Sequence, residues 1–195
     1  MKNRSTTLNW PDWPANNHKA ADILMPLSTR LRSWFRINRI KLGSNAVLKN
    51  VSFLGKIVVK NKGVLQIGTQ TIFLSDFQSS RLAVEKNATL SIGKNCCMNS
   101  VIIAANQHIE IGDNCQFGPY VHLMDSDFHD LNDRSQSGKS APILIGNNVQ
   151  LSTRVIILRG VQIGDNAIVL PGAVVTKNIP ANTKAAGVPA RILVN

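Results

Sequence analysis

A six-residue repeat of aliphatic side chains runs through the second half of this chain. Read in steps of six, the repeat consists of Ile145, Leu151, Ile157, Ile163, Val169 and Val175. The position four residues later in each step is also small or aliphatic, at Val149, Val155, Val161, Ala167, Ala173 and Ile179. A hexapeptide period is the signature of a parallel β-helix, whose stacked coils bury these side chains against one another. The sequence therefore predicts an elongated all-β repeat fold. Aromatic residues make up only 5% of the chain, which is low for a packed sandwich.

Glycine and asparagine recur at fixed places in this repeat. Glycine follows the aliphatic residue at Gly68, Gly93, Gly112, Gly146 and Gly164, and asparagine comes two residues later at Asn95, Asn114, Asn148 and Asn166. Both residue types tolerate a positive φ and therefore mark turns. Ile145 and Ile163 open two such turns 18 residues apart, which predicts triangular coils of three short strands. The phase slips by one residue between Met98 and Ile111, which predicts an insertion in that coil.

The basic charge of the chain is concentrated at its N-terminal end. The net charge is +11, and residues 1–60 hold 11 of the 22 Lys and Arg residues but only two acids. We expect residues 1–41 to form a basic arm with a short helix at 26–40, and residues 42–195 to form the repeat domain. The amphipathic helix could cap the open end of the β-helix or lie on a membrane surface. A solvated basic face is the simpler explanation of the charge. No nucleic-acid motif accompanies it, so no nucleic-acid partner is predicted.

Cysteine usage and hydropathy bear on location. The three cysteines, Cys96, Cys97 and Cys115, are a poor disulfide framework, and Cys96 and Cys115 fall at inward positions of the repeat. Buried thiols are therefore predicted for these two residues. No apolar leader follows Met1, and no stretch reaches the apolar length of a membrane span. A cytoplasmic location is the prediction.

A long interruption of the repeat contains the strongest candidate for chemistry. The six-residue phase breaks after Leu123 and resumes at Ile145, so residues 124–142 are predicted to form a loop excursion. This loop carries His129 among four acids, at Asp125, Asp127, Asp130 and Asp133. An imidazole titrates near neutral pH, and a neighbouring carboxylate can fix its tautomer, so His129 is a candidate general base.

Three other interpretations of this loop compete with a general-base site. A polar, solvated loop without a chemical role fits the composition equally well. A calcium loop would need glycine and glutamate where the chain has Asp130 and Gln136. A zinc site would need several histidines, for which His108, His122 and His129 are available.

Two stretches of the chain resemble the hexapeptide-repeat acyltransferases, which include galactoside, maltose and xenobiotic acetyltransferases. One stretch runs from Ile111 to the loop motif Asp-Ser-Asp-Phe-His at 125–129, a form similar to that of polysaccharide-linked sugar O-acetyltransferases. The other begins at Ile163 and contains Pro-Gly-Ala-Val-Val-Thr-Lys-Asn-Ile-Pro at 171–180 and Ala-Ala-Gly-Val-Pro-Ala-Arg at 185–191. The resemblance covers roughly residues 55–193. It implies a left-handed parallel β-helix that works as a homotrimer, with acetyl-CoA in the groove between adjacent β-helices. It also implies that the loop of one subunit delivers its histidine into that groove.

The resemblance also assigns roles to individual residues. His129 matches the catalytic base of the family, and Asp125 and Asp127 are expected to orient it or to contact the acceptor. The implied CoA-binding residues, which include a C-terminal tail, are Ser152, Thr153, Pro171, Thr176, Lys177 and Arg191. Backbone N–H groups near Ser152 and Thr153 would stabilise the developing negative charge. Asn99 falls close to an acceptor-site position.

The chain departs from the family pattern at two positions. Gln150 stands where the family usually places tryptophan, and Ser152 stands where glycine is expected. Both changes concern the packing of the pantetheine arm and not the base.

The activity that the resemblance implies is acetyl-CoA-dependent O-acetylation of a sugar hydroxyl in surface-polysaccharide biosynthesis, without a metal. The alternatives are an N-acetyltransferase acting on an amino sugar or a nucleotide-amino sugar, a zinc-dependent hydratase, and a non-catalytic scaffold. The histidine spacing does not match that of the β-helical carbonic anhydrases, which weakens the hydratase alternative.

Overall fold

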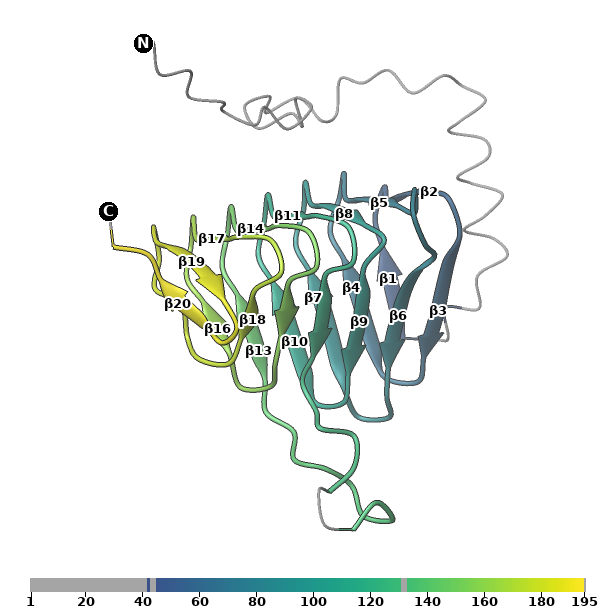
Figure 1. Ribbon diagram of the computed structural model, residues 1–195. Coiled ribbons are helices and arrows are strands. Elements are labelled where there is room, and N and C mark those ends of the chain that lie inside the picture. The colour runs from purple at the N-terminus through teal and green to yellow at the C-terminus, as the bar shows by residue number, and fades with distance from the viewer. Residues whose placement is uncertain (1–41, 43–44, 131–132, 195) are drawn as a thin grey trace.

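Short strands wound into stacked coils make up the body of the protein (Figure 1). The computed structural model describes residues 42, 45–130 and 133–194. The first sheet contains β1 (Ala46–Leu48), β4 (Val64–Ile67), β7 (Thr89–Ile92), β10 (His108–Ile111), β13 (Ile143–Ile145) and β16 (Gln162–Ile163). The second sheet contains β2 (Ser52–Leu54), β5 (Ile72–Leu74), β8 (Cys97–Asn99), β11 (Gln116–Phe117), β14 (Gln150–Leu151), β17 (Ile168–Val169), β19 (Lys184–Gly187) and β20 (Ala190–Ile192). The third sheet contains β3 (Ile57–Asn61), β6 (Ser80–Val84), β9 (Ile102–Ala105), β12 (His122–Met124), β15 (Ile156–Ile157) and β18 (Val174–Val175).

The register of the sheets follows the repeat. Ile145 pairs with Ile163, so one coil at the C-terminal end takes the predicted 18 residues. Ile92 pairs with Ile111, a coil of 19 residues, which confirms the predicted one-residue insertion. Neighbouring strands are parallel everywhere except at β19 and β20, which form an antiparallel pair.

The interior of the coils is filled by the repeat positions. In the second sheet the inward row runs through Phe53, Phe73, Met98, Phe117 and Leu151, all at most 1% exposed. The rings of Phe53 and Phe73 stack with their centroids 5.4 Å apart. Strands shorten from five residues in β3 and β6 to two in β15 and β18, and the coils narrow toward the C-terminal end (Figure 1). The large aromatic side chains therefore lie where the coils are widest.

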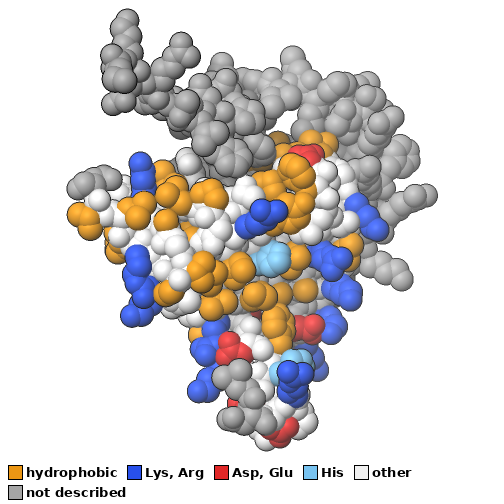
Figure 2. Space-filling model, in the orientation of Figure 1, with side chains coloured by type: hydrophobic (Ala, Val, Ile, Leu, Met, Phe, Trp, Pro, Cys, Tyr) orange, Lys and Arg blue, Asp and Glu red, His pale blue; other side chains and the backbone are white. Residues whose placement is uncertain are grey.

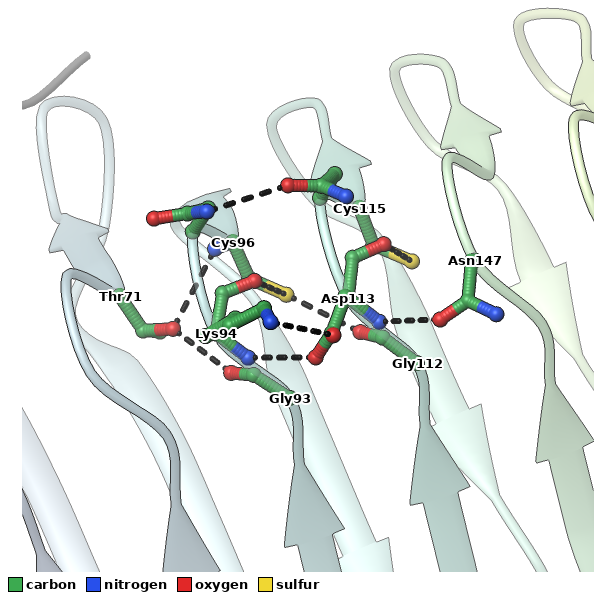
Figure 3. Close-up of polar contacts among 10 residues, drawn as sticks. Thr71, Gly93, Lys94, Cys96, Gly112, Asp113, Cys115 and Asn147 are labelled. Atoms are coloured by element: carbon green, nitrogen blue, oxygen red, sulfur yellow. Dashed lines mark hydrogen bonds and ion pairs between the residues drawn. The ribbon is translucent and has the colours of Figure 1, made fainter. Parts of the chain in front are cut away.

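The turns that follow the first-sheet strands are held by polar contacts from coil to coil. Asn95, Asn114, Asn148 and Asn166 all have φ between 55° and 59°, which confirms their prediction as turn residues. Figure 3 shows the inward side chains beside this turn donating to the carbonyl of the next coil. The Thr71 hydroxyl donates to Gly93, and the Cys96 thiol donates to Gly112 at 3.2 Å. The predicted burial of Cys96 and Cys115 is confirmed, and all three cysteines are free.

The predicted arm and the helix at 26–40 lie outside the described residues. Within the described residues no helix is long and apolar enough to cross a membrane.

Candidate active site

The long loop between β12 and β13 leaves the body at the corner that follows the third sheet, which we call the loop corner. The loop covers residues 125–142 and projects away from the coils (Figure 1). Two antiparallel bridges join its arms, one between Ser126 and Ser140 and one between His129 and Ser137. His129 therefore lies on a paired arm of the loop, and its side chain is exposed.

The backbone of His129 is held on both sides while its imidazole faces outward. Its N–H donates to the carbonyl of Asp127 at 2.7 Å. Gly138 lies so close that a Cβ there would come within 2.7 Å of the His129 carbonyl oxygen. Among the described residues, none hydrogen-bonds to the imidazole. This arrangement presents the ring to a partner outside the loop.

Asp127 is tied to the body of the protein by an arginine. The Nε of Arg159 donates to Oδ2 of Asp127 at 2.7 Å, and both side chains are about one-third exposed. Arg159 follows β15, one coil beyond the strand from which the loop departs. Asp127 therefore anchors the loop to the next coil.

Asp125 has a structural role that the sequence did not indicate. Its side chain is fully buried, and its two carboxylate oxygens accept N–H groups from Asn106, Gln107 and His108 at 2.7–2.8 Å. Asn106 and Gln107 form the turn between β9 and β10, and His108 is the first residue of β10. We therefore assign Asp125 to this turn in place of the predicted contact with His129 or an acceptor.

A second group of predicted residues lies at a different corner, which we call the Asn99 corner. It consists of the turns that follow the second-sheet strands: residues 75–79, Ser100, Tyr120, 152–154 and 171–172. Backbone hydrogen bonds join these turns, including Tyr120 N–H to Ser100 and Gly172 N–H to Thr153. The corner therefore collects Asn99, Ser152, Thr153 and Pro171. Within a single chain, the loop that carries His129 leaves the body on the side opposite to the Asn99 corner (Figure 1).

The two predicted backbone donors differ at this corner. The N–H of Ser152 donates to the Val169 carbonyl at 2.9 Å within the sheet ladder, so it is not available to a substrate. The N–H of Thr153 has no acceptor among the described residues. A Cβ on Gly118 would lie 3.0 Å from the Thr153 nitrogen, so the glycine keeps this N–H uncovered. Thr153 is thus the better candidate to stabilise an oxyanion.

Asn99 is part of a buried polar cluster. Its side chain is 1% exposed, and its Nδ2 donates to Oδ2 of Asp76 at 2.9 Å. Its Oδ1 accepts from the hydroxyl of Ser100 at 3.0 Å. Asp76 belongs to the loop between β5 and β6, which was not predicted from the sequence. The available signal was the loss of the six-residue phase after Thr71.

The remaining predicted CoA-binding residues lie toward the C-terminal end. Thr176 and Lys177 follow β18 at the loop corner, and both are exposed. Arg191 is exposed on β20, and its guanidinium donates to the Ala190 carbonyl at 3.0 Å. Lys177 and Arg191 are exposed cations of the kind that bind phosphate.

Metal or thiol chemistry finds little support in the described residues. They contain no group of three or more His, Cys, Asp or Glu side chains placed to hold a metal ion. His108 lies on β10 of the first sheet and His122 on β12 of the third. Burial raises the pKa of Cys97 to about 11, with further contributions from Cys96 and Asp76. Its thiol therefore stays protonated at neutral pH and is a poor nucleophile.

Comparison with known proteins identifies the repeat. Residues 142–177 match the family model described as bacterial transferase hexapeptide (six repeats). This segment of the chain is thus a bacterial-transferase type of hexapeptide repeat. Galactoside O-acetyltransferase of Escherichia coli is 38% identical over 109 residues, which cover 54% of each chain. A tetrahydropyridine-dicarboxylate N-acetyltransferase of Staphylococcus aureus is 41% identical over 54 residues, 28% of this chain and 23% of that protein. The chain thus matches about half, or less, of the length of these curated relatives.

Solved hexapeptide-repeat structures share the fold. A galactoside acetyltransferase in complex with coenzyme A is 25% identical and covers 88% of this chain and 72% of its own, with a TM-score of 0.54. A hexapeptide-repeat acetyltransferase of Vibrio cholerae, complexed with acetyl-CoA, is 21% identical with a TM-score of 0.59, over 90% of this chain and 82% of its own. AntD, an N-acyltransferase of Bacillus cereus, is 21% identical with a TM-score of 0.67, over 83% of this chain and 87% of its own. The predicted resemblance to hexapeptide-repeat acyltransferases and the left-handed parallel β-helix are confirmed.

Proposed function

We propose that this protein transfers the acetyl group of acetyl-CoA to a hydroxyl of a sugar in surface-polysaccharide biosynthesis. The observation that carries the proposal is the 38% identity to a galactoside O-acetyltransferase over 109 residues. The exposed histidine on a paired loop and the uncovered Thr153 N–H add the two groups that acyl transfer needs. A cytoplasmic location and membrane contact through residues 1–41 stay predictions.

In the proposed reaction His129 acts as the general base. Its imidazole removes the proton of the acceptor hydroxyl as that oxygen attacks the thioester carbonyl carbon. The N–H of Thr153 donates to the carbonyl oxygen as it becomes negatively charged. When the tetrahedral intermediate collapses, the carbon–sulfur bond breaks and the imidazolium returns the proton to the departing thiolate.

The proposed working unit is the homotrimer that the family resemblance implies, and each site in it needs two subunits. His129 belongs to the loop corner and Thr153 to the Asn99 corner of the same chain, so the loop of one subunit would reach the Asn99 corner of its neighbour. The outer row of the third sheet is suited to a subunit interface, since it runs through Ile102, His122, Ile156 and Val174. Burial lowers the pKa of the His122 imidazole, so these four side chains are uncharged at neutral pH, and the cation of Arg81 stands beside Ile102 at the next position of the row. Hydrophobic side chains are widely distributed on the face seen in Figure 2. An extended apolar surface of this kind favours contact with a second copy.

Assaying thiol release from acetyl-CoA tests the proposed activity. We expect turnover with at least one member of a panel of sugars, and mass spectrometry of the product should locate the acetyl group on oxygen. Calorimetry with coenzyme A alone supplies the control for binding. If coenzyme A does not bind, the acetyltransferase proposal is wrong.

Transfer to an amino group is the second candidate. It is favoured by the resemblance to an N-acetyltransferase of Staphylococcus aureus and by the fold of AntD, which was solved with dTDP. The same base can accept a proton from an amine, so the geometry of His129 does not discriminate. Acetylation on nitrogen in the product analysis would select this alternative.

The anchor between Arg159 and Asp127 is expected to affect the reaction through the position of the loop. Replacing Arg159 with glutamine should lower kcat about three- to tenfold, because a displaced base is poorly aligned with the acceptor proton. The melting temperature should hardly change, because an exposed ion pair contributes only about 0.2–1 kcal/mol. Stopped assays at saturating acetyl-CoA, together with thermal melts, measure both quantities.

Two further variants test this explanation. Arg159→Lys should recover part of kcat, and Asp127→Asn should add little to Arg159→Gln, because both variants break the same contact. Additive losses would mean that Asp127 acts independently of Arg159.

A further inference from the structure

The most exposed aromatic ring of the described residues stands at the Asn99 corner. Phe77 is 64% exposed and belongs to the loop between β5 and β6. Its ring lies 6.0 Å from that of Tyr120, measured between centroids, with the planes inclined by 43°. The guanidinium of Arg154 lies over the Tyr120 ring, 5.6 Å from its centre. An aromatic surface therefore ends in a cation.

Hydrogen bonds hold the loop that presents Phe77. The N–H groups of Phe77 and Gln78 both donate to the hydroxyl of Ser100 at 3.2 Å. The side-chain amide of Gln78 donates to the Ser100 carbonyl, also at 3.2 Å. The exposed ring is therefore positioned before any ligand arrives, which lowers the entropic cost of binding.

The backbone at this corner holds large side chains in an unfavourable region. Tyr120 and Arg154 have φ of 64° and 58°, where glycine and asparagine are ordinarily found. The next turn of the same corner has glycine, Gly172, with φ of 74°. Strain of this kind at bulky residues is typical of functional sites. The same turn position after β8 and β17 also has a positive φ, at Ser100 and Gly172, so the conformation is set by the turn and only the bulk of Tyr120 and Arg154 is unusual.

Opposite charges lie at the two ends of the Asn99 corner. Asp76 lies at the Phe77 end, where its exposed carboxylate can accept hydrogen bonds from sugar hydroxyls. Arg154 lies at the other end, and none of the described carboxylates pairs with it. Successive coils are separated by about 4.8 Å, so Tyr120 and Arg154 are about one sugar-ring width apart. A ring on the aromatic pair would place a substituent beside the guanidinium.

We propose that Phe77, Tyr120 and Arg154 bind an acceptor sugar that carries an anionic group, a carboxylate or a phosphate, with the anion on Arg154. This inference rests on the proposed function only in calling the sugar an acceptor. Binding of the sugar to these three side chains does not require acetyl transfer. The C–H groups of a sugar pack on the negative face of an aromatic ring. A guanidinium binds carboxylate and phosphate oxygens through two parallel N–H donors. The carboxylate of Asp76 disfavours an anion at the opposite end, which fixes the orientation.

The experiment compares glucuronate and glucose 1-phosphate with glucose as acceptors. In the wild type, kcat/KM should be higher for at least one charged sugar than for glucose. Arg154→Gln should lower the ratio of charged to neutral kcat/KM about tenfold or more, the size expected for a lost hydrogen bond between charged groups. Arg154→Lys should retain much of the ratio, and Phe77→Ala should lower kcat/KM for all three sugars. Lys94→Gln, which removes a cation at another corner, should leave the ratio as in the wild type.

Binding of the same sugars without acetyl-CoA, measured by saturation-transfer NMR, separates the two proposals. Glucuronate or glucose 1-phosphate binding that depends on Arg154, in a protein that transfers no acetyl group, would support this inference while the proposed function fails. The inference is overturned if Arg154→Gln lowers charged and neutral acceptors equally. It is also overturned if that variant raises only the KM for acetyl-CoA, or if no charged sugar binds better than glucose. The two charged sugars distinguish a carboxylate from a phosphate as the anion.

Discussion

Replacing His129 with alanine is expected to lower kcat about 100-fold or more, in the range that a general base contributes. The imidazole is exposed and makes no hydrogen bond with another described residue, so its removal should leave the melting temperature unchanged. Affinity for coenzyme A should also be retained, because the proposed base contacts the acceptor proton and not the nucleotide. Thiol release at saturating acetyl-CoA, thermal melts and calorimetry measure the three quantities.

His108 provides the matched control for this prediction. Its imidazole is also partly exposed, on β10 of the first sheet, where it lies 3.4 Å from a carboxylate oxygen of Glu110. His108→Ala should keep kcat close to that of the wild type. If His129→Ala retains activity within a few-fold, or if both variants lose it alike, His129 is not the base. Loss of coenzyme A binding in His129→Ala would instead indicate that the loop belongs to the nucleotide site.

The fold could be predicted from the sequence because each coil repeats the same local chemistry. An aliphatic residue every six positions, such as Ile145 and Ile163, specifies both the inward face and the register between coils. Asn148 and Asn166 adopt the positive φ that their residue type favours. Periodicity of this kind is visible in one sequence, and it needs no alignment.

The site was only partly predictable, because its contacts join residues without a periodic relation. Arg159 meets Asp127 from 32 positions away, and Asn99 meets Asp76 from 23 positions away. No pattern in the amino-acid sequence predicts that these residues pair. The acids near His129 in sequence suggested partners for its imidazole, yet the buried Asp125 turned out to be directed at a neighbouring turn. Residues that are close in sequence need not be close in space when the base of their loop is buried, as it is at Asp125.

Removing the carboxylate of Asp125 is expected to destabilise the protein strongly. Its two oxygens accept three backbone N–H groups in a fully buried position. Asp125→Ala leaves all three part-buried donors without their charged acceptor, and each lost hydrogen bond of this kind costs about 1–3 kcal/mol. The expected loss is therefore about 3 kcal/mol or more in the free energy of unfolding. Asp125→Asn should lose less, about 2 kcal/mol, because its single oxygen still satisfies one or two donors. Urea unfolding of both variants measures these values.

Asp127→Asn is the control that separates a structural acid from one that acts through the loop. Asp127 is exposed and makes one ion pair, so its variant should unfold within about 0.5 kcal/mol of the wild type. We therefore expect opposite behaviour from two acids two residues apart: Asp125 variants lose stability, and Asp127→Asn loses kcat. If Asp125→Asn keeps its stability and loses kcat, the carboxylate acts on His129 or on the acceptor, and our assignment to the turn is wrong. The backbone contacts argue against that outcome, because rotating Asp125 toward the loop would leave three N–H groups without their acceptor.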